Sequence, residues 1–247
     1  IDTRVDPCCR RLPGTWDAYV HDVLQIPGLE SIIRPDGETS LRVRGLEFAR
    51  TAGAELLFGI SLRRAATPHH KNEIRVLAEN LARLRSPHAA DRLNPLYAAT
   101  PEAWLESEVR RQLEELDAQL CPSPVYGQVP AFAAADRGVL DLLAVDRGGR
   151  LAVLELKAAQ DIHLPLQALD YWIRVKWHLD RGDFARQGYF PGVGLRHDAP
   201  RLLLVSPALE FHPANERVLR FFSPSIPVER VGVGLQWRKE LKVVFRS

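Results

Sequence analysis

The 247-residue chain contains no methionine, only three cysteines, and only five lysines beside 28 arginines. Cys8, Cys9 and Cys121 make an odd count without any C-x-x-C spacing, which argues against a disulfide framework or structural zinc site and fits a reducing cytoplasm. No apolar run approaches the roughly 20 residues that a membrane helix needs, so we expect no membrane association. Because the chain begins at Ile1 and lacks methionine, we expect its natural start to lie upstream.

Charge is nearly balanced, with 33 Lys and Arg against 31 Asp and Glu and a formal net charge of +2. This balance by itself predicts no polyanionic partner. Two segments nevertheless carry a local surplus: residues 61–92 hold seven basic side chains against three acids, and residues 217–247 hold seven against two. Each surplus predicts either a phosphate-facing patch or an ordinary solvated surface.

Proline-containing turns near residues 93–101 divide the chain into two parts. We expect a smaller α+β N-terminal domain over residues 1–97 and an α/β domain over residues 98–247. The first part contains patterns for helices over 15–25 and 72–85 and for a hairpin of two strands, 41–49 and 55–62. Its role stays open among substrate binding, formation of a homodimer and docking onto a partner protein.

The second part alternates strands and helices in the way that predicts a mixed central sheet flanked by helices. The patterns predict helices over 101–120, 165–180 and 214–222 and strands over 125–132, 139–145, 151–157, 201–205, 228–233 and 241–245. In the helix over 165–180, the expected buried stripe consists of Leu166, Leu169, Ile173 and Trp177. The opposite, polar stripe consists of Gln167, Tyr171, Arg174 and His178.

Charged side chains interrupt two of the predicted buried strands. A turn at 147–149 pairs residue 141 with about residue 155, so Asp141 would face Glu155, and Lys157 shares the face of Glu155. Burying isolated carboxylates is costly, and a hard divalent cation such as Mg²⁺ or Mn²⁺ is the simplest partner for such a pair. An ordinary Glu–Lys ion pair at the end of a strand is the alternative interpretation.

Three motifs in this order carry a family resemblance. Asp141, then Glu155-Leu156-Lys157, and then Gln167-x-x-x-Tyr171 resemble the PD-(D/E)XK nuclease superfamily, and the last motif is similar to that of its RecB-type branch. Leu140 stands where the signature of the family has proline. Proline at that position is not a metal ligand, so the departure weakens the resemblance more than the chemistry.

The resemblance implies a restriction-endonuclease-like core in which Asp141, Glu155 and the main-chain carbonyl of Leu156 hold the metal ion. It also implies an acid from the helix that precedes the hairpin. Helical projection of residues 101–120 favours Glu106, which flanks the core face, over Glu108, which is expected to be solvated. Glu106 would complete the metal shell or hold a second ion.

Together these residues predict a metal-dependent nuclease that hydrolyses phosphodiester bonds, with DNA as the preferred substrate. Lys157 would position the attacking water, Gln167 and Tyr171 would orient Lys157 or the substrate backbone, and Arg174 and His178 would extend the substrate track. Two alternatives stay open: a catalytically silent binding module with the same fold, and a glycoside hydrolase that uses two carboxylates. The choices between DNA and RNA, single and double strands, and internal and terminal cleavage are also open.

Overall fold

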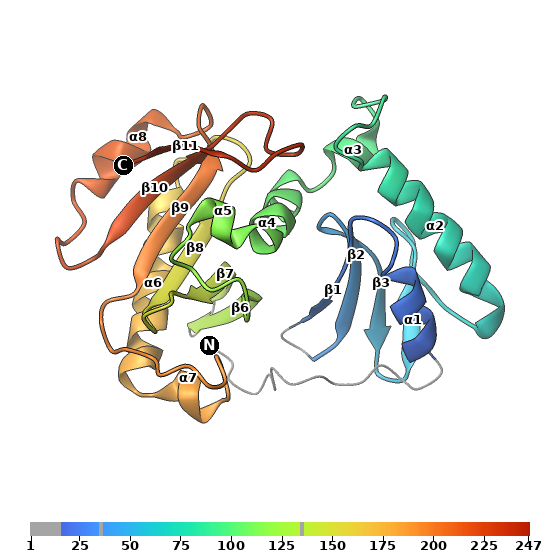
Figure 1. Cartoon of the computed structure of the whole chain (residues 1–247), viewed down its shortest axis with the longest axis horizontal. Helices are drawn as coiled ribbons and strands as arrows, with labels where there is room; N and C mark the ends of the chain where they lie inside the picture. Colours follow the sequence, from blue (N-terminus) through green and yellow to red (C-terminus); the bar gives the residue numbers. More distant parts are fainter. Residues whose placement is uncertain (1–15, 35–36, 134–135) are drawn as a thin grey trace. The chain divides into compact units, whose positions relative to one another are not determined.

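The computed structural model of the protein describes residues 16–34, 37–133 and 136–247 (Figure 1). These residues form two compact units, of which one ends at Trp104 and the other runs from Leu105 to Ser247. The division falls inside helix α4 (Pro101–Arg111), a little beyond the boundary expected near residue 97. No helix in the described ranges combines the length and the apolar character that crossing a bilayer requires.

The N-terminal unit is an antiparallel sheet accompanied by helices. Its strands lie side by side in chain order: β1 (Leu29–Ile33), β2 (Thr39–Val43), β3 (Leu46–Ala52), β4 (Glu55–Phe58) and β5 (Arg64–Ala65). Its helices are α1 (Asp17–Val23), η1 (Pro68–His70), α2 (Lys71–Leu84) and α3 (Pro95–Ala98). Val23 of α1, Phe48 and Leu56 of the sheet, and Ile74 of α2 are fully buried in one core. The unit is therefore α+β, with helices close to both predicted positions.

The single strand predicted over 41–49 is wrong, because the chain reverses direction within it. Arg44 and Gly45 have φ angles of +43° and +81°, as the two central residues of a tight hairpin turn require. A Cβ on Gly45 would lie 2.1 Å from the carbonyl oxygen of Ala103, so only glycine fits there. Arginine at position 44 gives no turn signal, and β1 has no counterpart among the predicted strands.

The C-terminal unit contains one mixed sheet of six strands in the order β11-β10-β9-β8-β7-β6. The strands are β6 (Tyr126–Ala133), β7 (Asp136–Val145), β8 (Leu151–Leu156), β9 (Arg201–Pro207), β10 (Val228–Val233) and β11 (Val243–Arg246). Strands β8, β9 and β10 run parallel, and the remaining neighbours pair antiparallel. The predicted α/β class with a mixed sheet and flanking helices is therefore confirmed.

Helices pack on this sheet and bury its apolar side chains. Helix α6 (Leu164–Asp180) contacts β7, β8 and β9, and its Trp172 and Val175 share a core cluster with Val153 and Leu204 (Figure 1). The shorter helices are α5 (Leu113–Leu116), α7 (Asp183–Arg186) and α8 (Pro213–Leu219). All six residues of β8 are buried, which is the burial expected for a central strand.

The helix predicted over 101–120 is interrupted. Gln112 has a φ of −126° and a ψ of 41°, and this residue separates α4 from α5. The apolar residues that recur at helical spacing in this range are nevertheless all buried: Leu105, Val109, Leu113, Leu116 and Leu120. The apolar pattern was therefore right about burial, although the last of these residues lies beyond α5 and bridges Asp146.

The buried stripe predicted for the helix over 165–180 is wrong. Leu166, Ile173 and Trp177 expose 53 %, 53 % and 55 % of their surface. The buried residues of α6 are instead Leu164, Pro165, Ala168, Trp172, Val175 and Leu179. Apolar residues occupy most of the circumference of this helix, so periodicity alone fits two stripes. The indole Nε1 of Trp172 donates to the carbonyl of Pro200 at 2.7 Å, and this bond helps to fix the rotation of the helix.

Candidate active site

The β7–β8 hairpin has the register that its turn predicts. Leu142 pairs with Leu154, and Val145 pairs with Leu151. Gly149 in the turn has a φ of +86°, and a Cβ on it would lie 2.2 Å from the carbonyl oxygen of Gly194. The turn therefore fixes the register of the whole hairpin. Its open end, opposite the turn, begins beyond the last pair, Leu142 and Leu154.

Beyond the last paired residues, a side chain takes the place of the backbone acceptor. The N–H of Lys157 donates to the carbonyl of Val205 on β9 at 3.0 Å. Because successive N–H groups point to opposite edges of a strand, the N–H of Leu156 points toward β7. The Asp141 carboxylate accepts this N–H at 2.8 Å. Asp141 is thereby held next to Glu155, as the register predicts.

Glu155 is a buried acid in an unfavourable environment. It is 3 % exposed, and its Oε2 has no hydrogen-bond partner among the described residues. Burial, and secondly the negative charge of Asp141, raise the pKa of Glu155 from its ordinary value of 4.5 to about 9. The ammonium of Lys157, whose Nζ lies 3.7 Å from Oε1 of Glu155, acts in the opposite direction but does not outweigh them. Lys157 alone therefore does not compensate the buried carboxylate of Glu155.

Lys157 lies between two carboxylates. Its Nζ is 3.7 Å from Oε1 of Glu155 and 3.8 Å from Oδ2 of Asp161. Asp161 is not among the residues predicted for the site. The signal that could have identified it is its position four residues after Lys157 and three residues before the start of α6.

Glu106, the acid predicted to complete the metal shell, is buried on α4 in an ion pair with Arg110. A Cβ on Gly127 of β6 would lie 2.9 Å from Oε1 of Glu106. Gly127 pairs with Leu142, so Glu106 approaches the sheet on the face of Leu142, whereas Glu155 projects from the opposite face, which packs on α6. Within the described ranges, no three His, Cys, Asp or Glu side chains are grouped as a metal site.

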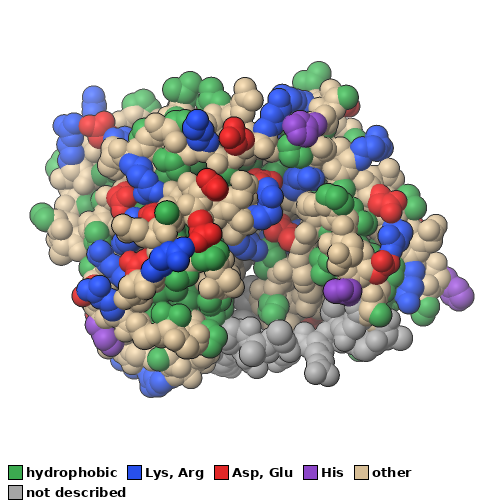
Figure 2. Space-filling model, in the orientation of Figure 1, with side chains coloured by type: hydrophobic (Ala, Val, Ile, Leu, Met, Phe, Trp, Pro, Cys, Tyr) green, Lys and Arg blue, Asp and Glu red, His purple; other side chains and the backbone are tan. Residues whose placement is uncertain are grey.

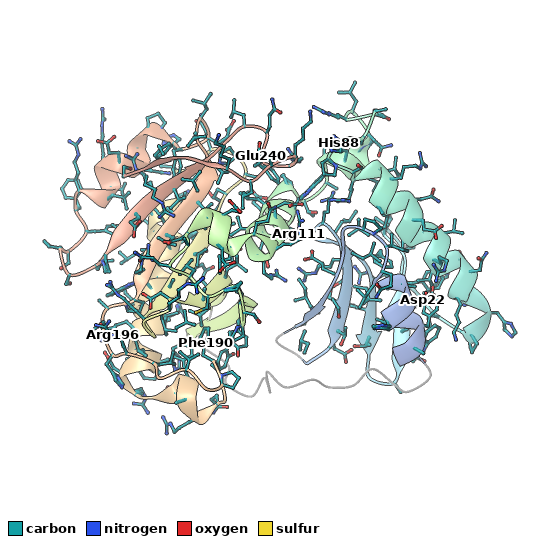
Figure 3. The ribbon with its side chains drawn as sticks, viewed as in Figure 1. Asp22, His88, Arg111, Phe190, Arg196 and Glu240 are labelled. Atoms are coloured by element: carbon teal, nitrogen blue, oxygen red, sulfur yellow. The ribbon has the colours of Figure 1, made fainter. Side chains whose placement is uncertain are left out.

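Glu108, which was expected to be solvated, is instead 3 % exposed. Its carboxylate pairs with Arg111, labelled in Figure 3, and accepts a bond from Nε2 of Gln112 at 2.9 Å. Helical projection places the Cβ of a residue on a face, but it does not account for partners such as Arg111 and Gln112 that engage the carboxylate. The prediction about Glu108 is therefore wrong for a local reason.

The polar side chains predicted on α6 are Gln167, Tyr171, Arg174 and His178. Gln167 is exposed, and Tyr171 packs at the edge of the α6 core cluster. Nη2 of Arg174 lies 2.8 Å from Oδ2 of Asp170. Nδ1 of His178 lies 2.6 Å from a carboxylate oxygen of Asp183, yet burial keeps the pKa of the imidazole below its usual value. His178 is therefore neutral at neutral pH, and its one ring N–H donates to Asp183.

Many charges of the two basic segments are balanced by nearby acids. In the first segment the ion pairs are Arg63–Glu47, Arg64–Glu73 and Arg75–Asp22, and in the second they are Arg220–Glu216 and Arg246–Glu229. Arg85 is fully buried and donates to the carbonyls of Leu96, Ala99 and Arg44. Figure 2 likewise shows Lys and Arg interspersed with Asp and Glu on the visible surface.

No protein-family model matches the chain, and no curated protein matches it. Solved structures that resemble it include a repair endonuclease from Pyrococcus abyssi and a complex of EndoMS with double-stranded DNA. Each is 13 % identical to this chain with a TM-score of 0.34, and the match covers 83 % of this chain and 77 % of the other. A likeness at this level assigns no function, so function rests on the residues of the chain itself.

Proposed function

We propose that the protein is a divalent-metal-dependent nuclease of the PD-(D/E)XK type that hydrolyses phosphodiester bonds in nucleic acid, with DNA as its preferred substrate. The observation that carries the proposal is the acid pair at the open end of the β7–β8 hairpin. Asp141 is fixed by the N–H of Leu156, and beside it Glu155 is buried with an unpartnered oxygen and a pKa of about 9. Such a pair is costly in the absence of a cation.

The residues at this position fit a hard divalent cation, which prefers oxygen ligands. Asp141 and Glu155 would hold Mg²⁺ or Mn²⁺ through their carboxylates. The carbonyl of Leu156 would be a further ligand, because the N–H and C=O of one residue point to the same edge of a strand and its N–H already points to Asp141. When bound, the ion supplies a water of lowered pKa and stabilises charge on the phosphoryl oxygens.

The protein side chains then have distinct tasks. Lys157, whose Nζ lies 3.7 Å from Glu155, would orient the attacking water and balance charge on the phosphate. Gln167 and Tyr171 would orient Lys157 or the substrate backbone. Arg174 and His178 would extend the contact along the nucleic-acid strand. Glu106 pairs with Arg110 on the other face of the sheet, so in this proposal it lies outside the metal shell. In this proposal the N-terminal unit recognises substrate or forms a dimer.

The alternative is a nucleic-acid-binding module with the same fold and no catalytic activity. The observation that favours it is the ion pair between Glu106 and Arg110, which holds the third predicted acid in a structural role. A module of this kind has no reason to bind Mg²⁺ or Mn²⁺, so metal binding separates the two proposals.

The test is cleavage of single- and double-stranded DNA in the presence of Mg²⁺ or Mn²⁺. Glu155→Gln and Lys157→Ala should each lower the rate by about a hundredfold or more, because each removes a group that acts on the reacting phosphate. Glu216→Gln is the matched control, since this acid is 53 % exposed in its pair with Arg220. Cleavage by the two site variants at the rate of the parent protein would refute the proposal.

A further inference from the structure

Asp161 is held in one orientation by the turn that precedes α6. Its Oδ1 accepts the backbone N–H of His163 at 2.7 Å, in the manner of an Asx turn, and α6 begins at the next residue, Leu164. The same carboxylate presents Oδ2 to Nζ of Lys157 at 3.8 Å. One oxygen therefore anchors the side chain, and the other faces the lysine.

Lys157 has no tight ion pair with either of its two acidic neighbours. Distances of 3.7 Å to Glu155 and 3.8 Å to Asp161 exceed hydrogen-bond length, so the ammonium is shared between the two carboxylates. Its side chain is 18 % exposed, and screening by water is limited. The position of the ammonium therefore depends on how much negative charge each neighbour offers.

We propose that Asp161 is the positioning residue for Lys157, an inference that rests on the proposed nuclease function. A cation bound by Asp141 and Glu155 takes up the charge of Glu155 and weakens its hold on the ammonium. Among the described contacts of Lys157, Asp161 is then the remaining anionic partner. Asp161 keeps Nζ next to the acid pair, where the phosphate reacts, instead of letting it turn into solvent.

The charge balance supports this role. Asp141, Glu155 and Asp161 with Lys157 carry a formal charge of −2 when all four are ionised, and one divalent cation cancels it. Without Asp161 the remaining three groups carry −1. The ammonium of Lys157 is then left with Glu155, which also binds the ion, as its carboxylate neighbour. Asp161 thus acts through Lys157 and is not itself a ligand in this account.

The first test follows the lysine directly in the full-length protein. The chain has only five lysines, so the side-chain ¹³Cε signals of a ¹³C-lysine-labelled sample are few. In metal-free protein, and again with Mg²⁺, Asp161→Asn should shift the Lys157 signal relative to the parent protein. The signals of the other four lysines should stay in place. Asp161→Asn keeps the acceptor for His163, so the turn is preserved. Asp180→Asn is the matched control, because Asp180 pairs with Lys176 and should shift that signal alone.

The second test measures catalysis and metal binding together. With saturating Mg²⁺, Asp161→Asn should lower kcat about 10- to 100-fold at unchanged KM, as for other residues that orient a catalytic group. Calorimetry with Mn²⁺ alone should show less than about a tenfold change in affinity, since no ligand is removed. In a Lys157→Ala background, Asp161→Asn should have no further effect on the residual rate.

The outcomes separate the two levels of the account. Parent protein that cleaves DNA while Asp161→Asn is equally active, or a Lys157 signal that does not move, overturns the role of Asp161 and leaves the nuclease proposal standing. An additive loss in the double variant also overturns it, because Asp161 would then act independently of Lys157. Parent protein that neither binds Mn²⁺ nor cleaves DNA overturns the proposed function, and the role of Asp161 falls with it.

Discussion

The Asp141 carboxylate accepts the backbone N–H of Leu156 at 2.8 Å, at the point where the pairing of β7 with β8 has ended. The side chain of Asp141 therefore accepts the N–H that a backbone carbonyl of β7 would otherwise accept. This bond holds Asp141 against the strand that carries Glu155 and brings two carboxylates together in a buried place. The consequences can be measured through stability, because the repulsion exists in the folded state and disappears on unfolding.

Stability should depend on pH through Glu155. Its carboxyl group has a pKa of about 9 in the folded protein and about 4.5 when unfolded, so the folded state binds more protons between these values. The free energy of unfolding of the metal-free protein should therefore fall as pH rises from about 4.5 to about 9. Urea denaturation in the presence of a chelator, at a series of pH values, measures this loss.

Glu155→Gln is the control for that measurement, because the amide does not ionise. The free energy of unfolding of this variant should not show the decline that Glu155 causes as pH rises. At pH 8 it should exceed the free energy of unfolding of the parent protein. Mg²⁺ or Mn²⁺ should stabilise the parent increasingly as pH rises, since the ion binds the ionised carboxylate. Identical pH profiles for the two proteins would contradict the burial of an uncompensated acid at this position.

The hairpin turn should be intolerant of a side chain at Gly149. With a φ of +86° and a carbonyl oxygen 2.2 Å from the place of a Cβ, Gly149→Ala should cost about 2–4 kcal/mol of stability. Gly182→Ala is the comparison: its φ is +69°, but a Cβ there meets no atom within 4 Å, so the cost should be about 1 kcal/mol. Equal denaturation midpoints for the two variants would show that the close approach to Gly194 is absent.

The two tryptophans of α6 should differ in their contribution to stability. Trp172 is 8 % exposed and bonds to Pro200, so Trp172→Ala should cost about 3–5 kcal/mol. Trp177 is 55 % exposed, and Trp177→Ala should cost no more than about 1 kcal/mol. Thermal melting followed by circular dichroism compares them. A larger loss for Trp177 would restore the stripe expected from periodicity.

A buried charge network at the start of β9 should be sensitive to removal of its centre. Arg201 is 8 % exposed and donates to Asp117 at 2.6 Å and to Glu229 at 2.9 Å. Arg201→Ala leaves Asp117 buried without this partner and should cost about 3–5 kcal/mol in urea denaturation. Arg220→Ala removes an exposed pair with Glu216 and should cost less than about 1 kcal/mol. Similar losses in both variants would indicate that Arg201 is solvated.

Sequence predicted best where a pattern has a single structural solution. The continuous apolar strands on either side of Gly148 and Gly149 fit a central hairpin, and the turn fixes its register. The pairing of Leu142 with Leu154 could therefore be predicted from the sequence. The buried face of α6 could not be predicted, because apolar residues lie on two sides of this helix. Its rotation is determined only when it packs against the sheet.

Other features depend on contacts between side chains that no periodicity records. Arg44 gives no sign of a turn, yet it occupies one with a positive φ. Glu108 pairs with Arg111 and accepts a hydrogen bond from Gln112, and Asp161 faces Lys157 because a hydrogen bond from the N–H of His163 orients it. Glu108 and Asp161 are each engaged by local side-chain interactions, which the hydrophobic pattern does not record.

The most direct test of the central claim is a crystal of the protein soaked in Mn²⁺ and measured for anomalous scattering at the manganese edge. We expect a single strong peak between the carboxylates of Asp141 and Glu155, and its loss in Glu155→Gln. Absence of a peak there at saturating Mn²⁺, or a peak only at other residues, would contradict the claim that this acid pair binds a divalent cation.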